Sequence, residues 1–229
     1  MILSAHQPAY LPWLGYLERI SLSDKFVILD QVQFEKNSFI NRNKIKTKED
    51  ALWLTIPVNL KNHLEGTIKN TTINTNDKWK IKHWKTIQQN YSKAPFFDFH
   101  KDFFEEAYKK KWKTINEVNH FFLKYLLKLF DIKTEILFLS DLNVKKKKND
   151  LIIELCDLFS ADAFIFGSQG KDYFSEEKFK KNSIKTLFHN FEYKVYKQLG
   201  EKFIPNLSSL DLIMNENPKN LAKYVKKNL

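Results

Sequence analysis

The first thirty residues of the chain restrict its fold more than any other part of the sequence. Two short apolar segments, residues 2–5 and 26–29, have the length and composition of buried strands. Pro12, between them, suits the first turn of a helix. Large apolar residues then recur at helical spacing, at Trp13, Tyr16, Leu17 and Ile20. Because strand, helix and strand follow within about thirty residues, we predict a βαβ unit with parallel strands.

Strands and helices continue to alternate along the rest of the chain. Residues 39–46 and 52–58 flank a polar turn and are predicted to form a β-hairpin, with a further strand near 67–73. Three helices are predicted within about 76–131, the first capped by Asn76. Later strands are predicted at 135–139, 163–166 and 185–188, with a helix at 150–159 and short helices around Leu210 and Leu221.

These elements predict an α/β fold: a mostly parallel sheet with flanking helices, a β-hairpin and a helical insertion at about 76–131. No linker-like segment divides residues 1–229, so we expect one domain. With 43% hydrophobic and 15% aromatic residues, the chain can form a large core. The insertion is expected to be mainly structural, with buried side chains at Trp79, Trp84, Ile87 and Phe122.

The net charge of +11 fits nucleic acid, anionic lipid or a phosphorylated small molecule as a partner, and a Lys-rich composition without functional meaning is the alternative that we favour over nucleic acid. The positive charge comes mostly from Lys residues spread along the chain, and Arg occurs only at positions 19 and 42. This scarcity disfavours nucleic acid as the partner, because Arg is the residue that most often contacts phosphate and guanine with two hydrogen bonds. The single cysteine, Cys156, allows no internal disulfide. No apolar run is long enough to span a bilayer and no signal-peptide core is evident, so we expect a cytoplasmic protein.

The first candidate site follows the first predicted strand. His6, Gln7 and Tyr10 lie between the strand end and a helix start, where free backbone N–H groups favour anions. His6 at the carboxyl edge of a parallel sheet could bind phosphate or act as acid or base. A structural turn, in which His6 bonds to the backbone, is the alternative reading.

The second candidate site follows the second predicted strand. Asp30 is a candidate base, Gln33 and Asn41 offer amide donors and acceptors for sugar hydroxyls, and Arg42 suits a carboxylate or phosphate. The alternative is a polar turn held by local side-chain bonds.

The third candidate site follows the predicted strand at 163–166. Gly167, Ser168 and Lys171 could cradle an anion, Asp172 is a candidate catalytic base, and Tyr173 a binding residue. The glycine spacing is not that of a Walker loop, and a tight turn is the alternative. No spacing of His, Cys and acidic residues predicts a metal site, and nothing in the sequence specifies a cofactor.

Together these segments resemble the WbqC-like family. The matching motifs are His6-Gln7-Pro8-x-Tyr10-Leu11-Pro12-Trp13-x-Gly15-Tyr16, Asp30-x-x-Gln33-Phe34, Asn41-Arg42-Asn43-x-Ile45, Trp53-Leu54-Thr55-Ile56-Pro57-Val58, Gly167-Ser168 with Lys171-Asp172-Tyr173, and Phe203-x-Pro205-x-Leu207-Ser208-x-Leu210-Asp211. They span nearly the whole chain in order. Phe166 departs from the family pattern, in which Ser precedes the motif glycine.

The resemblance implies a role in making bacterial surface polysaccharide of the O-antigen type. The function expected from it is a transferase that modifies a sugar or nucleotide-linked sugar, for example an aminoacyl or glycine transferase that forms an amide. A nucleotide-dependent ligase or nucleotidylyltransferase, which would need ATP and magnesium, stays open as an alternative. A basic nucleic-acid-binding module is the third alternative, indicated only by the charge.

Overall fold

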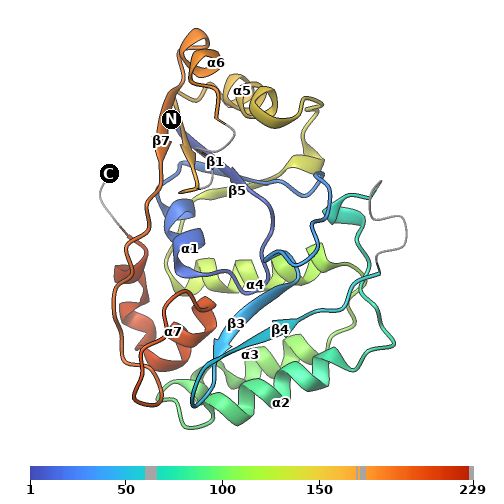
Figure 1. Ribbon diagram of the computed structural model, residues 1–229, viewed down its shortest axis with the longest axis vertical. Coiled ribbons are helices and arrows are strands. Elements are labelled where there is room, and N and C mark those ends of the chain that lie inside the picture. Colours follow the sequence, from blue (N-terminus) through green and yellow to red (C-terminus); the bar gives the residue numbers. More distant parts are fainter. Residues whose placement is uncertain (60–65, 169, 171–173, 227–229) are drawn as a thin grey trace.

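The computed structural model describes residues 1–59, 66–168, 170 and 174–226 (Figure 1). Its centre is a five-stranded sheet in the order β5-β2-β1-β6-β7, in which every neighbouring pair is parallel. The strands are β1 (Ile2–His6), β2 (Lys25–Ile28), β5 (Glu135–Phe138), β6 (Ala163–Phe166) and β7 (Lys185–Phe188). The predicted α/β class and the N-terminal βαβ unit are confirmed.

Helices cover both faces of this sheet because its strands are apolar on both sides. Helix α1 (Leu14–Ser21) connects β1 to β2 on one face. Helices α5 (Lys148–Phe159) and α6 (Glu176–Lys181) lie on the other (Figure 1). The side-chain alternation of β2 matches this arrangement: Phe26 packs with the α1 cluster and Val27 with the α5 cluster.

The chain leaves β1 and β6 in opposite directions. From β1 it passes through α1 to β2, and from β6 it passes through α6 on the other face to β7. Strands β1 and β6 are neighbours, so their carboxyl ends form a topological switch point. Open parallel sheets bind ligands in the crevice outside such a point.

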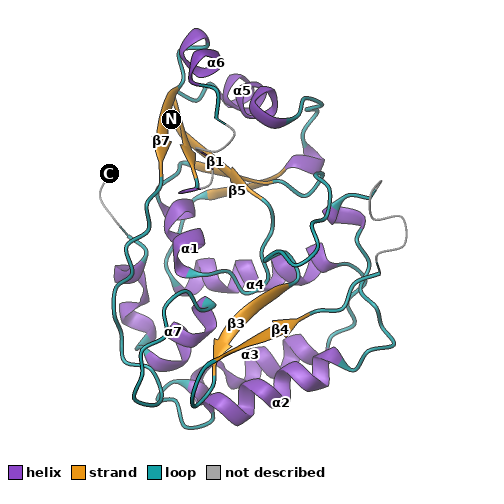
Figure 2. Cartoon of the chain, viewed as in Figure 1, coloured by secondary structure: helices purple, strands orange, loops and turns teal. Residues whose placement is uncertain are grey.

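A separate antiparallel hairpin, β3 (Arg42–Lys46) and β4 (Ala51–Thr55), lies away from the sheet (Figure 2). Helix α2 (Trp79–Tyr91) contacts it through a bond between the ring of His83 and the carbonyl of Thr55. Helix α3 (Phe97–Lys109) runs beside α2, and α4 (Ile115–Leu129) lies nearer the sheet. The hairpin and helical insertion were both predicted.

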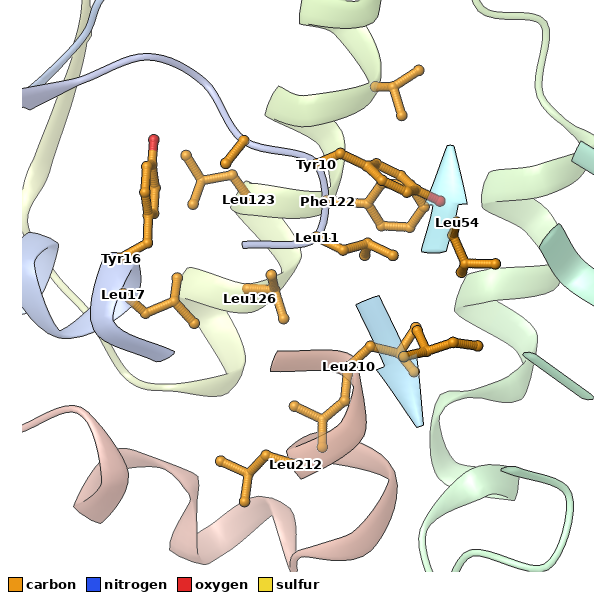
Figure 3. Packing of buried hydrophobic residues seen from close by; sticks show 14 of the residues in the cluster. Tyr10, Leu11, Tyr16, Leu17, Leu54, Phe122, Leu123, Leu126, Leu210 and Leu212 are labelled. Atoms are coloured by element: carbon orange, nitrogen blue, oxygen red, sulfur yellow. The ribbon is translucent and has the colours of Figure 1, made fainter. Parts of the chain in front are cut away.

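One cluster of buried side chains joins the hairpin, these helices and the α1 face of the sheet. In Figure 3 the ring of Tyr10 lies against Phe122 of α4 and next to Leu54 of β4. Leu210 enters the same region from α7 (Ser209–Asn215), which precedes a 3-10 helix at Pro218–Tyr224. Among the described residues, no helix is both long and apolar enough to cross a bilayer.

Three local predictions are wrong. The segment expected as a strand at 67–73 contains a 3-10 helix, Ile68–Asn70, because its backbone bonds to loop carbonyls such as that of Val32 rather than to a strand. The N-cap of α2 is Lys78, since Asn76 lies in a turn in which its backbone N–H donates to Asn74 Oδ1. Trp84 is only half-buried, because it stacks at the edge of the core on Phe97.

Candidate functional site

The loop between β1 and α1 has an unusual backbone. Leu11 is buried and has a φ of 43°, in the left-handed region that a leucine rarely adopts. Asn43 of β3 holds the loop there, donating to the carbonyls of Tyr10 and Leu11 at 3.2 and 2.7 Å. Strained backbone of this kind clusters at functional sites, so the residues that flank Leu11 are candidates for a functional role.

His6 ends β1 at the start of this loop and is partly buried. Its Nδ1 lies 2.8 Å from the carbonyl oxygen of Gln7, so Nδ1 carries the proton and Nε2 is left as an acceptor. Burial, reinforced by the charge of Arg19, lowers the pKa of His6 to about 3. The imidazole is therefore neutral near pH 7 and suited to accept a hydrogen bond rather than to supply a proton.

Arg19 brings a buried positive charge to the switch point. Ser4 pairs with Ile165, so continuing the register by two residues places Gly167 beside His6. The Arg19 guanidinium, on a side chain only 5% exposed, reaches the space that a Cβ at Gly167 would fill. The glycine thus makes room for a guanidinium at the carboxyl edge of the sheet, where it favours an anion.

Glu18 and His189 form a second polar pair on the same face. Glu18 is fully buried in α1, and its Oε2 lies 2.7 Å from His189 Nε2. His189 directly follows β7, and its backbone N–H donates to the carbonyl of Phe166. Glu18 Oε1 has no hydrogen-bond partner among the residues that the structure describes. A histidine oriented by a carboxylate is a common arrangement for proton transfer.

Asp30 lies at the carboxyl end of β2 but faces the interior. It is fully buried, and its two carboxylate oxygens accept from the Ser140 N–H at 2.9 Å and from Asn116 Nδ2 at 3.3 Å. These bonds join the end of β2 to the end of β5 and to α4. The carboxylate has no exposed surface through which it could meet a ligand in this structure.

Tyr10 and Asn41 also lie in the interior. The Tyr10 hydroxyl hydrogen-bonds with His83 Nδ1 at 3.0 Å and with the hydroxyl of Tyr108. Asn41 donates to the carbonyl of Ile56 at 2.8 Å, across the base of the hairpin. Both residues position the loop and hairpin that surround the candidate site.

The remaining candidates are divided between the site and the surface. Gln7 and Ser168 follow His6 and Gly167 at the switch point, and Ser168 is exposed. Gln33 is also exposed and forms an isolated bridge with Thr67. Lys171, Asp172 and Tyr173 lie outside the described residues.

Arg42 lies on the outer face of β3, with its guanidinium carbon 4.3 Å from the centre of the Trp53 ring. It donates to the side-chain and backbone oxygens of Asn37. Arg42 therefore does not contact the polar groups around His6. A series of contacts through the rings of Trp53, Phe39 and Trp13 nevertheless connects Arg42 to His6.

Glu18, Arg19 and His189 are the site residues that sequence reasoning missed. Two of them lie in a short helix where charged residues are ordinarily solvated, and the third follows an edge strand. The signal available was the rarity of arginine, since Arg19 is one of only two in the chain. Their burial depends on the segment around Phe191 that covers α1, where the Phe191 ring fits against Gly15.

No group of three His, Cys, Asp or Glu side chains able to hold a metal ion occurs within the described part of the chain. Cys156 is buried in α5, and burial raises the pKa of its thiol to about 12. A thiol of this kind is a poor nucleophile.

The fold and site define an α/β protein with a cluster of buried polar side chains at the carboxyl edge of a parallel sheet. The chain belongs to the WbqC-like protein family, whose model matches residues 7–223. It is similar to Rv1507c, an uncharacterized protein of Mycobacterium tuberculosis: the two are 31% identical over 211 residues, which cover 91% of each chain. No solved structure gives a significant match.

Proposed function

We propose that this protein is a transferase that modifies a sugar or nucleotide-linked sugar, in the synthesis of bacterial surface polysaccharide. The observation that carries the proposal is the position of Arg19. Its buried guanidinium lies against Gly167, at the point where β1 and β6 diverge and beside the strand that ends at His6. The planar, donor-rich guanidinium suits a phosphate or carboxylate on the substrate.

The neighbouring side chains suit a group transfer to an amine or hydroxyl. Such a nucleophile must lose a proton as its new bond forms. We assign proton acceptance to His189, because Glu18 orients its ring through Nε2. We assign substrate binding to His6, because its neutral ring offers Nε2 as an acceptor for a hydroxyl or amine. Amide formation by aminoacyl transfer fits these roles.

A thermal-shift screen with nucleotide sugars, ATP with magnesium, amino acids and random-sequence DNA tests the proposal. A ligand at about 100 times its Kd adds about 2.7 kcal/mol to stability, so a true substrate raises the Tm by several degrees. We expect nucleotide sugars to give this rise. Stabilisation by ATP and magnesium alone would favour the ligase alternative, and stabilisation by DNA alone the nucleic-acid alternative.

A further inference from the structure

The outer face of the hairpin carries two cations over one indole ring. Along β3 and β4 alternate side chains face the core or the solvent, and Lys44 pairs directly with Trp53 on the solvent face. The Lys44 ammonium lies 5.0 Å from the centre of the Trp53 ring, and the Arg42 guanidinium carbon 4.3 Å from it. Trp53 itself is 37% exposed.

A series of rings leads from Trp53 to the candidate site. The centres of Trp53 and Phe39 are 5.8 Å apart, those of Phe39 and Trp13 5.0 Å, and those of Trp13 and His6 5.9 Å. Phe39 is 42% exposed. We call Trp13, Phe39 and Trp53 the aromatic patch. An exposed aromatic surface that continues into a polar site is a common form of ligand-binding surface.

Within the described part of the chain, the two cations beside the aromatic patch lack a carboxylate partner. Among the described residues, neither Arg42 nor Lys44 has a carboxylate within 4.0 Å. The Arg42 bonds go to Asn37 alone, and its Nε is buried without a partner in the described part of the chain. Both side chains are pure donors, so they select a ligand edge that is rich in acceptors.

We propose that the aromatic patch binds the base of a nucleoside diphosphate carried by the substrate, with Arg42 and Lys44 donating to the carbonyl oxygens of that base. The diphosphate then extends toward His6, at the inner end of the series of rings. Aromatic side chains and Arg guanidinium planes both stack on nucleobases. Because the two cations only donate, the carbonyls of uracil or thymine, or the O6 and N7 edge of guanine, fit better than the edge of cytosine or adenine that carries an amino donor. This inference rests on the proposed function, in which the substrate is nucleotide-linked.

Isothermal titration of the full chain with UDP, CDP and inorganic pyrophosphate tests the proposal. Removing one base-stacking ring typically weakens binding about tenfold to hundredfold, so Trp53→Ala should weaken UDP binding by that factor. Pyrophosphate binding should not change, because pyrophosphate has no base. The wild type should prefer UDP over CDP, and Arg42→Gln should remove the preference.

Two variants serve as matched controls. Lys48→Gln removes one exposed positive charge from the tip of the same hairpin, and Phe99→Ala removes an exposed ring, 63% accessible, from α3. Both should bind UDP as the wild type does. Unfolding curves for all four variants would exclude misfolding as the cause of any loss.

The outcomes separate this inference from the proposed function. UDP binding that is unchanged in both Trp53→Ala and Arg42→Gln overturns the inference, while the proposed function stands if the wild type still binds UDP and transfers a sugar-linked group. UDP binding weakened by Trp53→Ala without any transfer supports the inference and contradicts the proposed function. If Trp53→Ala instead converts a dimer to a monomer, or abolishes DNA binding while UDP binding is unchanged, the patch is a protein or nucleic-acid surface and the inference is wrong.

Discussion

His6 illustrates how burial changes what a residue can do. As an exposed histidine it would titrate near pH 6.5 and could act as acid or base. In this fold its ring packs edge-to-face against Trp13 and Tyr16. Burial, reinforced by the charge of Arg19, lowers its pKa, so the ring is neutral near pH 7. Its remaining capability is to accept a hydrogen bond at Nε2.

We therefore predict different results for two substitutions of His6. His6→Ala should leave the fold intact, because the ring makes a single hydrogen bond, to the carbonyl of the adjacent residue, yet it should abolish substrate binding or turnover. His6→Gln keeps an acceptor and should retain activity within about tenfold of the wild type. Steady-state kinetics measure both. A loss of about 10²–10⁴-fold in the Gln variant as well would mean that His6 transfers a proton.

Buried histidines also predict how stability depends on pH. Burial lowers the pKa of His83 and of His100 to about 4, against about 6.5 in an unfolded chain. Between these values the unfolded chain binds more protons than the folded one. The contribution of each neutral, buried histidine to the free energy of unfolding is therefore complete above about pH 6.5. It is lost as the pH falls toward 4, by up to about 1.4 kcal/mol per pH unit for each histidine.

His100→Gln isolates one of these contributions. Urea unfolding near pH 5 and near pH 7 should show a smaller loss of stability on acidification in the variant than in the wild type, by about 1–2 kcal/mol. The comparison uses the difference between two pH values, so a general destabilisation by the substitution does not matter. Equal losses in the two proteins would show that His100 is not neutral in the fold.

At the scale of elements, one buried carboxylate joins three parts of the chain. Asp211 of α7 accepts from the hydroxyls of Tyr91 and Tyr196 at 2.8 and 2.7 Å. The Tyr91 hydroxyl in turn accepts from the backbone N–H of Lys46 in β3. Asp211 is fully buried, and burial raises its pKa.

We predict that Asp211→Ala lowers the free energy of unfolding by about 3 kcal/mol, because it leaves two buried hydroxyls without an acceptor. Tyr196→Phe removes one donor only and should cost about 1 kcal/mol. Urea unfolding of both variants measures the difference. If Asp211→Ala costs no more than Tyr196→Phe, the carboxylate does not hold α7 against the hairpin.

The main elements could be predicted because their signals are local. Runs such as Ala163–Phe166 have the composition of a buried strand, and the large apolar residues of α4 recur at helical spacing. The short helix Ile68–Asn70 could not be predicted, because its backbone N–H groups bond to carbonyls of the distant loop at residues 30–32. Local patterns do not encode such distant partners.

The candidate site was predictable only in part, for the same reason. Parallel strands bring their carboxyl ends together, so the placement of His6 beside Gly167 follows from the order of strands. The burial of Glu18 and Arg19 depends on how β7 and the segment after it cover α1, which sequence alone does not specify. Asp30 was predicted as a candidate base after the second strand, yet α4 and the end of β5 enclose it.

For the whole molecule, the charge of +11 is less informative than the position of single cations. We predict that binding of random-sequence DNA is weak near physiological salt and falls steeply as salt is added, as for any diffuse basic surface. Nucleotide-sugar binding, which we propose to involve the buried Arg19, should be much less salt-dependent. Fluorescence titrations at two salt concentrations compare the two ligands, and equal salt dependence would contradict a buried site.

The most direct test of the site is the affinity of the Gly167→Ala variant for a nucleotide sugar. A Cβ at this position would collide with the flexible end of Arg19 and displace the guanidinium without removing it, so the fold should persist. We predict that calorimetric titration shows binding at least tenfold weaker than in the wild type and in Ser92→Ala, a control at an exposed residue at the end of α2, with Tm values close to that of the wild type. Wild-type affinity in a folded Gly167→Ala protein would contradict a site at the carboxyl ends of β1 and β6.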